Sequence, residues 1–276
     1  MIGTFDYYRP HSIQEAVNLF EKLDLEEQSP VYYSGGTEII TFHRLDLIRP
    51  GAVIDIKSIP ECMEWKRDDS TLTIGSALSL TVIEKQKGFP LLSTVCSEVA
   101  DHTARNKITA GGNICGETFY REVALPFLLS DAHLVIGGKG GVREVEIHEL
   151  FKGHLQLNNG EFLLQLRVQR PFLEASYISI KRRRQWNTGY PVITVSSLYY
   201  QNRLRLAISG LYPYPFRAWE LERELNRPGT SEQRIEEALK TINGLVLEDE
   251  EGSANYRLFV LKNILYDVIE HLGGEK

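Results

Sequence analysis

The sequence predicts an α+β fold in two parts: a larger two-part α/β segment over residues 1–170 and a smaller α+β segment over residues 171–276. Helix-like and strand-like patterns alternate as far as about residue 168, which is typical of an α/β architecture. Three strand-like runs then follow one another and are succeeded by three helical patterns, the order expected of an α+β unit. The length of 276 residues fits one large domain or two modest ones, and the change of pattern places the boundary near Arg170–Pro171.

The first predicted element is a helix that begins after Ser12. Ser12 and Glu15 have the spacing of a capping box, and apolar residues recur at helical spacing from Ile13 to Leu23. Pro90 is a start signal for a second clear helix, expected over residues 91–102. The other elements expected in the larger part are strands over residues 31–33, 52–56, 72–74, 134–136, 142–147 and 162–168, and helices over residues 80–87 and 123–131.

The smaller part is predicted to contain a three-stranded antiparallel sheet followed by helices. Gln201–Asn202 has the length and composition of a short hairpin connection between two of the strands. The strands are expected over residues 176–181, 192–200 and 203–209, and the helices over residues 218–225, 232–242 and 255–272.

Composition and charge exclude several classes of protein. Hydrophobic residues make up 42% of the chain and charged residues 25%, as in an ordinary globular protein with a real core. The net charge of −6 argues against nucleic acid or anionic lipid as the main partner. No secretory signal opens the chain, and its most apolar late stretch, residues 258–269, is too short and too charged to cross a bilayer.

The cysteines and histidines do not form a recognisable metal or disulfide pattern. Cys62, Cys96 and Cys115 are odd in number and far apart, so neither a disulfide framework nor a zinc or iron–sulfur site is expected. The seven histidines lack the spacing of metal ligands. These features favour a reducing cytoplasm. Cys115 is interpreted as a small buried hydrophobic residue, and the alternative is that it faces a cofactor.

Two glycine-centred loops are the strongest candidates for a functional site. Ser34–Thr37 directly follows a predicted strand, and Thr109–Asn113 ends a polar loop that begins at Arg105. Paired glycines allow backbone N–H groups to approach an anion closely, and the flanking hydroxyls can also bind a pyrophosphate. Neither loop matches the Rossmann or the P-loop motif, so a tight turn is the better explanation of either loop taken alone.

Five stretches of sequence, taken together, resemble one known family. They are Phe5–Pro10, Ser34–Glu38, Val53–Ile56, Leu72–Gly75 and Arg105–Asn113. In this combination and spacing the chain resembles the FAD-binding (medium) subunit of the molybdenum hydroxylases, and the match covers nearly the whole chain. That family includes bacterial xanthine dehydrogenase, aerobic carbon monoxide dehydrogenase, and nicotinate and aldehyde dehydrogenases.

The resemblance implies a non-covalent FAD between a PCMH-type FAD-binding domain over residues 1–170 and a C-terminal flavoprotein domain over residues 171–276. It implies that two stretches hold the pyrophosphate: Tyr33, Ser34, Gly35, Gly36, Thr37 and Glu38 in the first loop, and Thr109, Ala110, Gly111, Gly112 and Asn113 in the second. It also implies that Leu163 packs on the flavin, that Lys181 contacts FAD, and that Tyr190 lies beside the isoalloxazine ring.

Three positions depart from the family pattern. Glu122 stands where the family has the aspartate of a P-x-x-D motif, Thr188–Pro191 lacks another aspartate, and Ala110 replaces an isoleucine. Because Glu122 keeps the carboxylate, we predict that it accepts hydrogen bonds from a cofactor hydroxyl or from loop N–H groups. The alternative is a solvated residue that caps the start of a helix.

The resemblance implies an electron-transfer subunit with no catalytic side chain of its own. Its partners would be a [2Fe-2S] subunit and a molybdenum-cofactor subunit, in a dimer of heterotrimers. NAD⁺ is the expected electron acceptor, with oxygen or a quinone as alternatives, and purine (xanthine) oxidation is one candidate reaction. Two other hypotheses stay open: a stand-alone FAD oxidoreductase of the same fold, and a nucleotide-binding scaffold subunit without a redox role.

Overall fold

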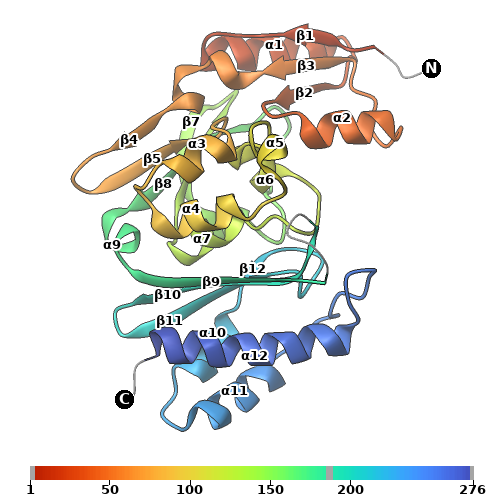
Figure 1. The fold of residues 1–276 in the computed structure, drawn as a ribbon. Coiled ribbons are helices and arrows are strands. Elements are labelled where there is room, and N and C mark those ends of the chain that lie inside the picture. Colours follow the sequence, from red (N-terminus) through yellow and green to blue (C-terminus); the bar gives the residue numbers. More distant parts are fainter. Residues whose placement is uncertain (1–3, 185–188, 274–276) are drawn as a thin grey trace.

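Three sheets are stacked along the length of the molecule in the computed structural model, which describes residues 4–184 and 189–273 (Figure 1). A small sheet lies at the top, a five-stranded sheet with its helices in the middle, and a four-stranded sheet with the last helices at the bottom. This arrangement confirms the predicted α+β class. We refer to these three layers as the upper, middle and lower parts.

The upper part is a three-stranded parallel sheet with the order β1-β3-β2. Its helix α1 is capped as predicted, because the Ser12 hydroxyl accepts the N–H of Glu15. The Glu15 carboxylate accepts the N–H of His11 instead of that of Ser12, so the capping box closes one residue earlier than expected. The elements are β1 (Asp6–Tyr8), α1 (Ile13–Leu25), β2 (Pro30–Tyr33), α2 (Thr37–Arg44) and β3 (Ala52–Asp55).

The middle part is an antiparallel sheet with the order β4-β5-β8-β6-β7, and it contributes most of the largest hydrophobic core. Its strands are β4 (Trp65–Arg67), β5 (Thr71–Gly75), β6 (His133–Gly138), β7 (Gly141–Glu146) and β8 (Phe162–Gln169). Its helices are α3 (Leu80–Lys85), α4 (Pro90–Ser97), α5 (His102–Arg105), α6 (Ala110–Cys115), α7 (Ala124–Leu129) and α8 (Ile147–Leu150), with short 3₁₀ turns at Ile56–Ser58 and Pro60–Met63.

Two helices near the predicted site differ from the sequence prediction. The helix expected over residues 91–102 ends at Ser97, because Ala100 adopts a positive φ of 46° and Asp101 then caps α5. The stretch Thr109–Asn113, predicted as a loop, forms the cap and first turn of α6. Glycine-rich sequence disfavours helix in propensity terms, so this helix is stabilised by its tertiary contacts.

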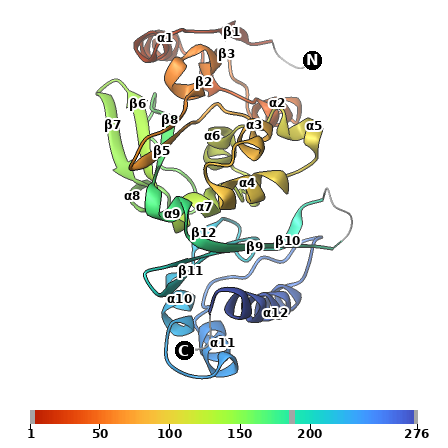
Figure 2. The same cartoon turned by 60° about the vertical axis from the view of Figure 1, so that its left-hand side comes forward.

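The lower part is an antiparallel sheet with the order β12-β11-β10-β9, backed by three helices (Figure 2). Gln201 and Asn202 both have positive φ and form the predicted hairpin turn. The two-residue strand β12 extends the three predicted strands to four. The elements are β9 (Ser176–Arg183), β10 (Pro191–Tyr200), β11 (Arg203–Ser209), β12 (Phe216–Arg217), α10 (Trp219–Leu225), α11 (Ser231–Lys240) and α12 (Ala254–Leu272).

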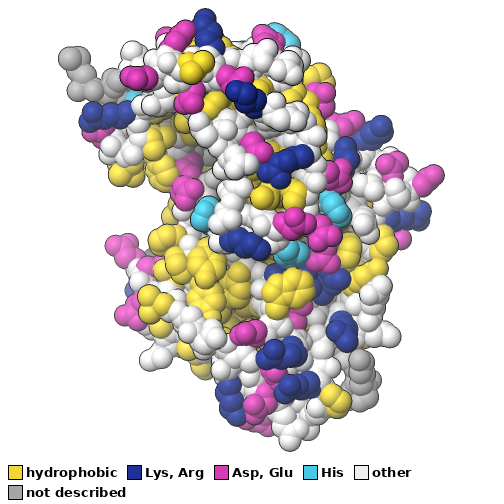
Figure 3. All heavy atoms as spheres, turned by 180° about the vertical axis from the view of Figure 1, so that it is seen from behind, with side chains coloured by type: hydrophobic (Ala, Val, Ile, Leu, Met, Phe, Trp, Pro, Cys, Tyr) yellow, Lys and Arg dark blue, Asp and Glu magenta, His cyan; other side chains and the backbone are white. Residues whose placement is uncertain are grey.

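A short helix, α9 (Arg170–Leu173), connects the middle sheet to the lower sheet, and the domain boundary near residue 170 stays a prediction. Within the described ranges, no helix is both long and apolar enough to span a bilayer. The face shown in Figure 3 carries lysine, arginine and acidic side chains in close alternation, with hydrophobic side chains gathered in a group at mid-height.

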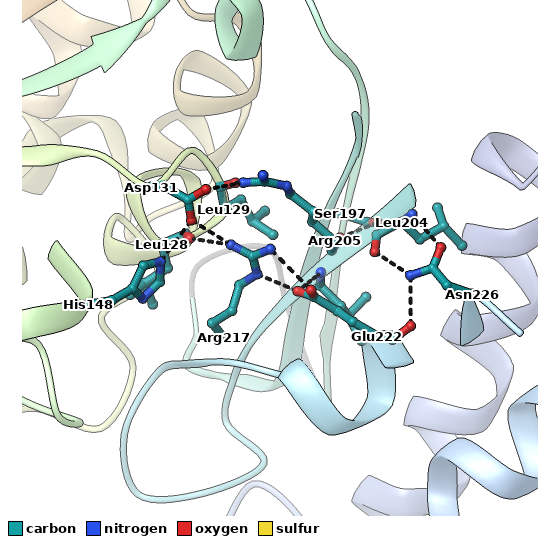
Figure 4. A network of polar contacts seen from close by, with 11 residues as sticks. Leu128, Leu129, Asp131, His148, Ser197, Leu204, Arg205, Arg217, Glu222 and Asn226 are labelled. Atoms are coloured by element: carbon teal, nitrogen blue, oxygen red, sulfur yellow. Dashed lines mark hydrogen bonds and ion pairs between the residues drawn. The ribbon is translucent and has the colours of Figure 1, made fainter. Parts of the chain in front are cut away.

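A polar network ties the middle part to the lower part (Figure 4). Asp131, just after α7, accepts hydrogen bonds from Arg205 at 2.6 Å and from Arg217 at 2.9 Å, and it contacts His148 Nε2 at 3.0 Å. Arg217 also pairs with Glu222 of α10. Burial alone would raise the pKa of Asp131, but the hydrogen bonds and the two arginine charges outweigh it and lower this pKa to about 2.

We expect Asp131→Asn to lower the free energy of unfolding at pH 7 by about 1–2 kcal/mol, a value discounted because the side chain is 33% exposed. A carboxylate whose folded pKa is depressed contributes stability above its ordinary pKa of 3.8. That contribution is lost as the pH falls from about 4 to about 2. Denaturant unfolding of both proteins across this range should therefore show the difference between them shrinking.

The matched control is Asp46→Asn, which breaks an ion pair of 2.6 Å with Arg49 on an exposed turn. Exposed pairs contribute little to stability, so this variant should unfold like the wild type at every pH. A difference between Asp131→Asn and the wild type that is independent of pH would contradict the assignment.

Candidate cofactor site

The candidate site is a cleft of about 660 Å³ where all three parts of the molecule meet. Its volume lies in the range of small-molecule and cofactor pockets. Eleven of the predicted site residues line it: Ser34, Gly35, Gly36, Thr37, Glu38, Thr109, Gly112, Asn113, Glu122, Lys181 and Tyr190. The remaining four, Tyr33, Ala110, Gly111 and Leu163, are not among the described residues that form its lining.

The first glycine loop presents open hydrogen-bond donors to the cleft. Gly36 has a φ of 72° and is the N-cap of α2, a helix that the sequence analysis did not predict. Among the residues that the structure describes, none accepts the backbone N–H groups of Gly35, Gly36, Thr37 and Glu38. Unsatisfied N–H groups at the start of a helix, with the positive end of its dipole, bind anions such as phosphate.

The second glycine loop differs, because its backbone donors already have partners. The N–H of Gly111 donates to the Ser76 carbonyl at 2.7 Å, and the N–H of Gly112 donates to Thr109 Oγ1 at 3.1 Å. The N–H groups of Ala110 and Asn113 donate to protein carbonyls at 3.0 and 2.9 Å. The expectation of free anion-binding N–H groups in this loop was therefore wrong, and what it offers the cleft is shape and side chains.

The glycines also allow the two loops to touch. A Cβ on Gly35 would lie 2.0 Å from the Lys107 carbonyl oxygen, which belongs to the polar loop that begins at Arg105. The hydroxyls of Ser34 and Thr109 are 2.7 Å apart and join the loops directly. Close packing between the upper and middle parts therefore requires glycine here, a reason that the sequence pattern alone did not reveal.

Glu38 lines the cleft but directs its carboxylate to the protein. Its oxygens accept the N–H of Glu117 at 2.8 Å and of Thr118 at 3.4 Å. A Cβ on Gly116 would lie 2.9 Å from one of these oxygens, so the segment that begins there folds closely around the carboxylate. Glu38 thus holds the segment after α6 against the first turn of α2.

Glu122 and Lys181, each predicted separately to contact FAD, form an ion pair with each other. Both side chains are only 4% exposed, and Lys181 Nζ lies 2.5 Å from Glu122 Oε1. Lys181 also donates a hydrogen bond to the Glu98 carbonyl at 2.9 Å, so its ammonium joins the two segments. The alternative of a solvated cap at Glu122 was wrong, because burial and pairing account for this carboxylate.

An aromatic pair forms another part of the cleft wall. Tyr190 is 58% exposed and stacks on Tyr120, with ring centroids 5.1 Å apart and an interplanar angle of 25°. The Tyr120 hydroxyl donates to Asp249 at 2.6 Å and accepts from Arg257 at 3.3 Å. Burial, then the bond to Asp249, raises the pKa of Tyr120, which keeps its hydroxyl protonated. Thr188, in the segment that departs from the family pattern, lies outside the described residues.

Sequence reasoning missed Arg257, which has no exposed surface and also pairs with Asp249. Its Nη1 donates to the Gly210 carbonyl at 2.7 Å, so α12 is tied to the sheet and to the aromatic wall together. The sequence did contain a signal for this residue. Arg257 has the same helical spacing as the apolar residues Val260 and Leu261, which predicts that it lies on the buried face of α12. A charged residue on a buried stripe has to find partners.

The remaining predicted positions lie away from the open cleft or differ from expectation. Leu163 on β8 is 3% exposed and packs inside the core of the middle part. Tyr33 lies beside Gly36, with Lys57 Nζ 4.8 Å from its ring centroid. Cys115 was predicted to be buried, but it is exposed where it lines the cleft. Protein around this thiol is still dense enough to raise its pKa to about 12.

Comparisons with known proteins agree with this geometry. The family described as the FAD binding domain in molybdopterin dehydrogenase matches residues 3–171. The carbon monoxide dehydrogenase medium chain of Hydrogenophaga pseudoflava is 26% identical over 269 residues, which cover 92% of this chain and 91% of the relative. The xanthine dehydrogenase FAD-binding subunit of Escherichia coli O157:H7 is 31% identical over 173 residues, covering 59% of this chain and 57% of the relative.

Solved structures show the same fold. Carbon monoxide dehydrogenase from Hydrogenophaga pseudoflava, in a form that lacks the Mo-pyranopterin moiety, superposes with a TM-score of 0.88 at 22% identity, covering 99% of this chain and 98% of the other. Quinoline 2-oxidoreductase from Pseudomonas putida 86 superposes with a TM-score of 0.85 at 21% identity, covering 99% of both chains.

Proposed function

This chain belongs to the family of FAD-binding medium subunits of the molybdenum hydroxylases, and we propose on that premise that it holds FAD in the cleft and carries electrons within a larger complex. The observation that supports this most directly is the set of open N–H groups at Gly35, Gly36, Thr37 and Glu38. A pyrophosphate supplies the acceptors that these donors lack.

Different residues of the cleft would bind different parts of the cofactor. The first loop binds the pyrophosphate, and the hydroxyls of Ser34 and Thr109 lie beside it. The carboxylate of Glu122 lines the cleft beside Lys181 and would accept a hydrogen bond from a cofactor hydroxyl. Tyr190 supplies an exposed ring for the flavin end of the cleft. Bound FAD itself supplies the redox chemistry, since a flavin exchanges electrons singly or in pairs.

The complex that we propose contains two further subunits. Three cysteines, all free, cannot supply the roughly eight ligands of two iron–sulfur clusters, so a partner [2Fe-2S] subunit would deliver the electrons. That subunit would draw them from a molybdenum-cofactor subunit, which would choose the organic substrate. We propose NAD⁺ as the acceptor, a dimer of heterotrimers as the assembly, and the reducing cytoplasm as the compartment.

Relatives of several substrate classes support purine, carbon monoxide and aldehyde oxidation equally. They include the matched xanthine, carbon monoxide and glyceraldehyde dehydrogenase chains. The substrate is therefore a property of the complex, and the single chain should oxidise none of these compounds.

We expect the purified chain to bind FAD with the visible absorption bands of an oxidised flavin, and bound FAD to protect Cys115 from alkylation. Cys115 lines the cleft, whereas Cys62 and Cys96 are buried and serve as internal controls. Because the pKa of the Cys115 thiol is raised, labelling with iodoacetamide should be run near pH 9. Mass spectrometry of the labelled peptides, with and without FAD, gives the rate at each cysteine.

Three results would count against the proposal. A chain that does not bind FAD would be the scaffold of the alternative hypothesis, without a redox role. FAD binding that leaves the labelling rate of Cys115 unchanged would place the cofactor elsewhere. Turnover of a purine or an aldehyde by the single chain would instead indicate a stand-alone oxidoreductase.

A further inference from the structure

A lysine that does not line the cleft binds the backbone of the first glycine loop. Lys57 Nζ donates to the carbonyl oxygen of Ser34 at 2.6 Å and to Asp55 Oδ2 at 2.8 Å. The same ammonium lies 4.8 Å from the centroid of the Tyr33 ring. Lys57 is not among the described residues that line the cleft, so it acts on the loop through the backbone.

Asp55 fixes the direction in which Lys57 points. It is 2% exposed at the end of β3, and its other oxygen accepts the N–H of Lys57 at 2.9 Å. The Tyr7 hydroxyl on β1 donates to the same carboxylate. Burial alone would raise the pKa of Asp55, but the bonds from Lys57 and Tyr7 outweigh it and lower this pKa. The carboxylate is therefore ionised and keeps its cation in place.

The contact with Ser34 bears on the phosphate donors, because the Ser34 carbonyl and the Gly35 N–H belong to one peptide group. A charged donor at the carbonyl polarises that peptide and strengthens the N–H on its other side as a donor. It also opposes rotation of the peptide, so the N–H of Gly35 keeps its direction. This N–H has no partner within the described parts of the chain, and Gly35 lines the cleft.

We propose that Lys57, oriented by Asp55 and Tyr7, is a positioning residue that fixes and polarises the Ser34–Gly35 peptide for binding of the cofactor pyrophosphate. This inference rests on the proposed function, since it assumes that a pyrophosphate occupies the first loop. The three side chains come from β1, β3 and the turn after β3. Residues of the upper sheet thereby strengthen the Gly35 N–H as a hydrogen-bond donor in the cleft.

The test is the affinity of the full chain for two ligands that share a pyrophosphate, FAD and ADP. Lys57→Met should weaken both by a similar factor, about ten- to hundredfold. Lys57→Arg, which can still reach the Ser34 carbonyl and Asp55, should restore most of the affinity. Quenching of FAD fluorescence and calorimetry with ADP measure the dissociation constants. Lys66→Met, the same loss of charge at an exposed position on β4, is the matched control and should bind like the wild type.

A second variant covers the case in which Lys57→Met does not fold. Lys57→Gln can donate a neutral hydrogen bond to the Ser34 carbonyl and should weaken both ligands about three- to tenfold. Dissociation constants within twofold of the wild type for folded Lys57→Met, or for Lys57→Gln if Lys57→Met does not fold, would overturn the inference. Loss of FAD affinity without loss of ADP affinity would also overturn it, because the effect would not act through the pyrophosphate. Failure of the wild type to bind FAD would refute the proposed function instead.

Discussion

Gly35→Ala is expected to weaken FAD binding at least about a hundredfold, because the added methyl group forces the two glycine loops apart. The added Cβ would lie 2.0 Å from the Lys107 carbonyl oxygen and 3.0 Å from its carbon. Both atoms are backbone, so the clash is relieved only when the two glycine loops separate. Separation breaks the 2.7 Å contact between the Ser34 and Thr109 hydroxyls and moves the open N–H groups, and 2.7 kcal/mol of lost binding is already about a hundredfold.

The control is Gly140→Ala in the turn between β6 and β7, where an added Cβ meets no atom within 4 Å. This variant should retain FAD fully. Gel filtration followed by the flavin-to-protein absorbance ratio compares the two, and circular dichroism confirms that each is folded. A Gly35→Ala protein that keeps a full complement of FAD would show that contact between the loops is not needed for the site.

Lys181→Met is expected to lower the free energy of unfolding by about 3–5 kcal/mol, because it leaves the buried Glu122 carboxylate without its cation. It should also weaken FAD binding more than tenfold. Glu122→Gln leaves the buried Lys181 ammonium without its carboxylate, but this ammonium keeps its hydrogen bond to the Glu98 carbonyl at 2.9 Å, so the variant should cost less stability. We still expect it to weaken FAD about tenfold, because it removes a charged acceptor.

The double variant, Glu122→Gln with Lys181→Met, tests whether the two residues act as a pair. It should be more stable than Lys181→Met alone, because no buried charge is left unpaired. Urea unfolding of the four proteins closes the cycle. Arg182→Met is the neighbouring control on β9, where an exposed ion pair of 3.2 Å with Asp267 contributes little. Strictly additive effects of the two substitutions would mean that the pair is not coupled.

The parts of the fold that depend on local sequence could be predicted. The cap at Ser12 and the hairpin at Gln201–Asn202 depend on residues close in the chain, and both are present in the structure. Helices α2 and α6 were missed for the opposite reason. Helix α2 directly follows the Gly35–Gly36 pair, which was interpreted as part of a loop. Helix α6 contains Gly111 and Gly112, which local propensity counts against a helix, and it is anchored through Gly111 to Ser76 on a distant segment.

The site was predicted as a set of residues but not as a set of contacts. Eleven of the fifteen predicted positions line the cleft, because the resemblance fixed their identity. The ion pair between Glu122 and Lys181 could not be predicted. Each residue was predicted separately to contact FAD, and no sequence pattern indicates that two such residues form a pair with each other. For the same reason, the sequence could not show that the N–H groups of the second loop donate to protein carbonyls, because folding brings those carbonyls close.

The burial of Arg257 has a consequence for the order of events during synthesis. This arginine on α12 is the partner of Asp249 and of the Tyr120 hydroxyl, so the aromatic wall of the cleft is complete only after α12 has docked. The ribosome delivers α12 after every other element of the site, and the upper and middle parts can fold before it emerges. The aromatic wall is therefore the last part of the cleft to form, and we expect a nascent chain stalled before Arg257 to present the open N–H groups of the first loop while this wall is unfinished.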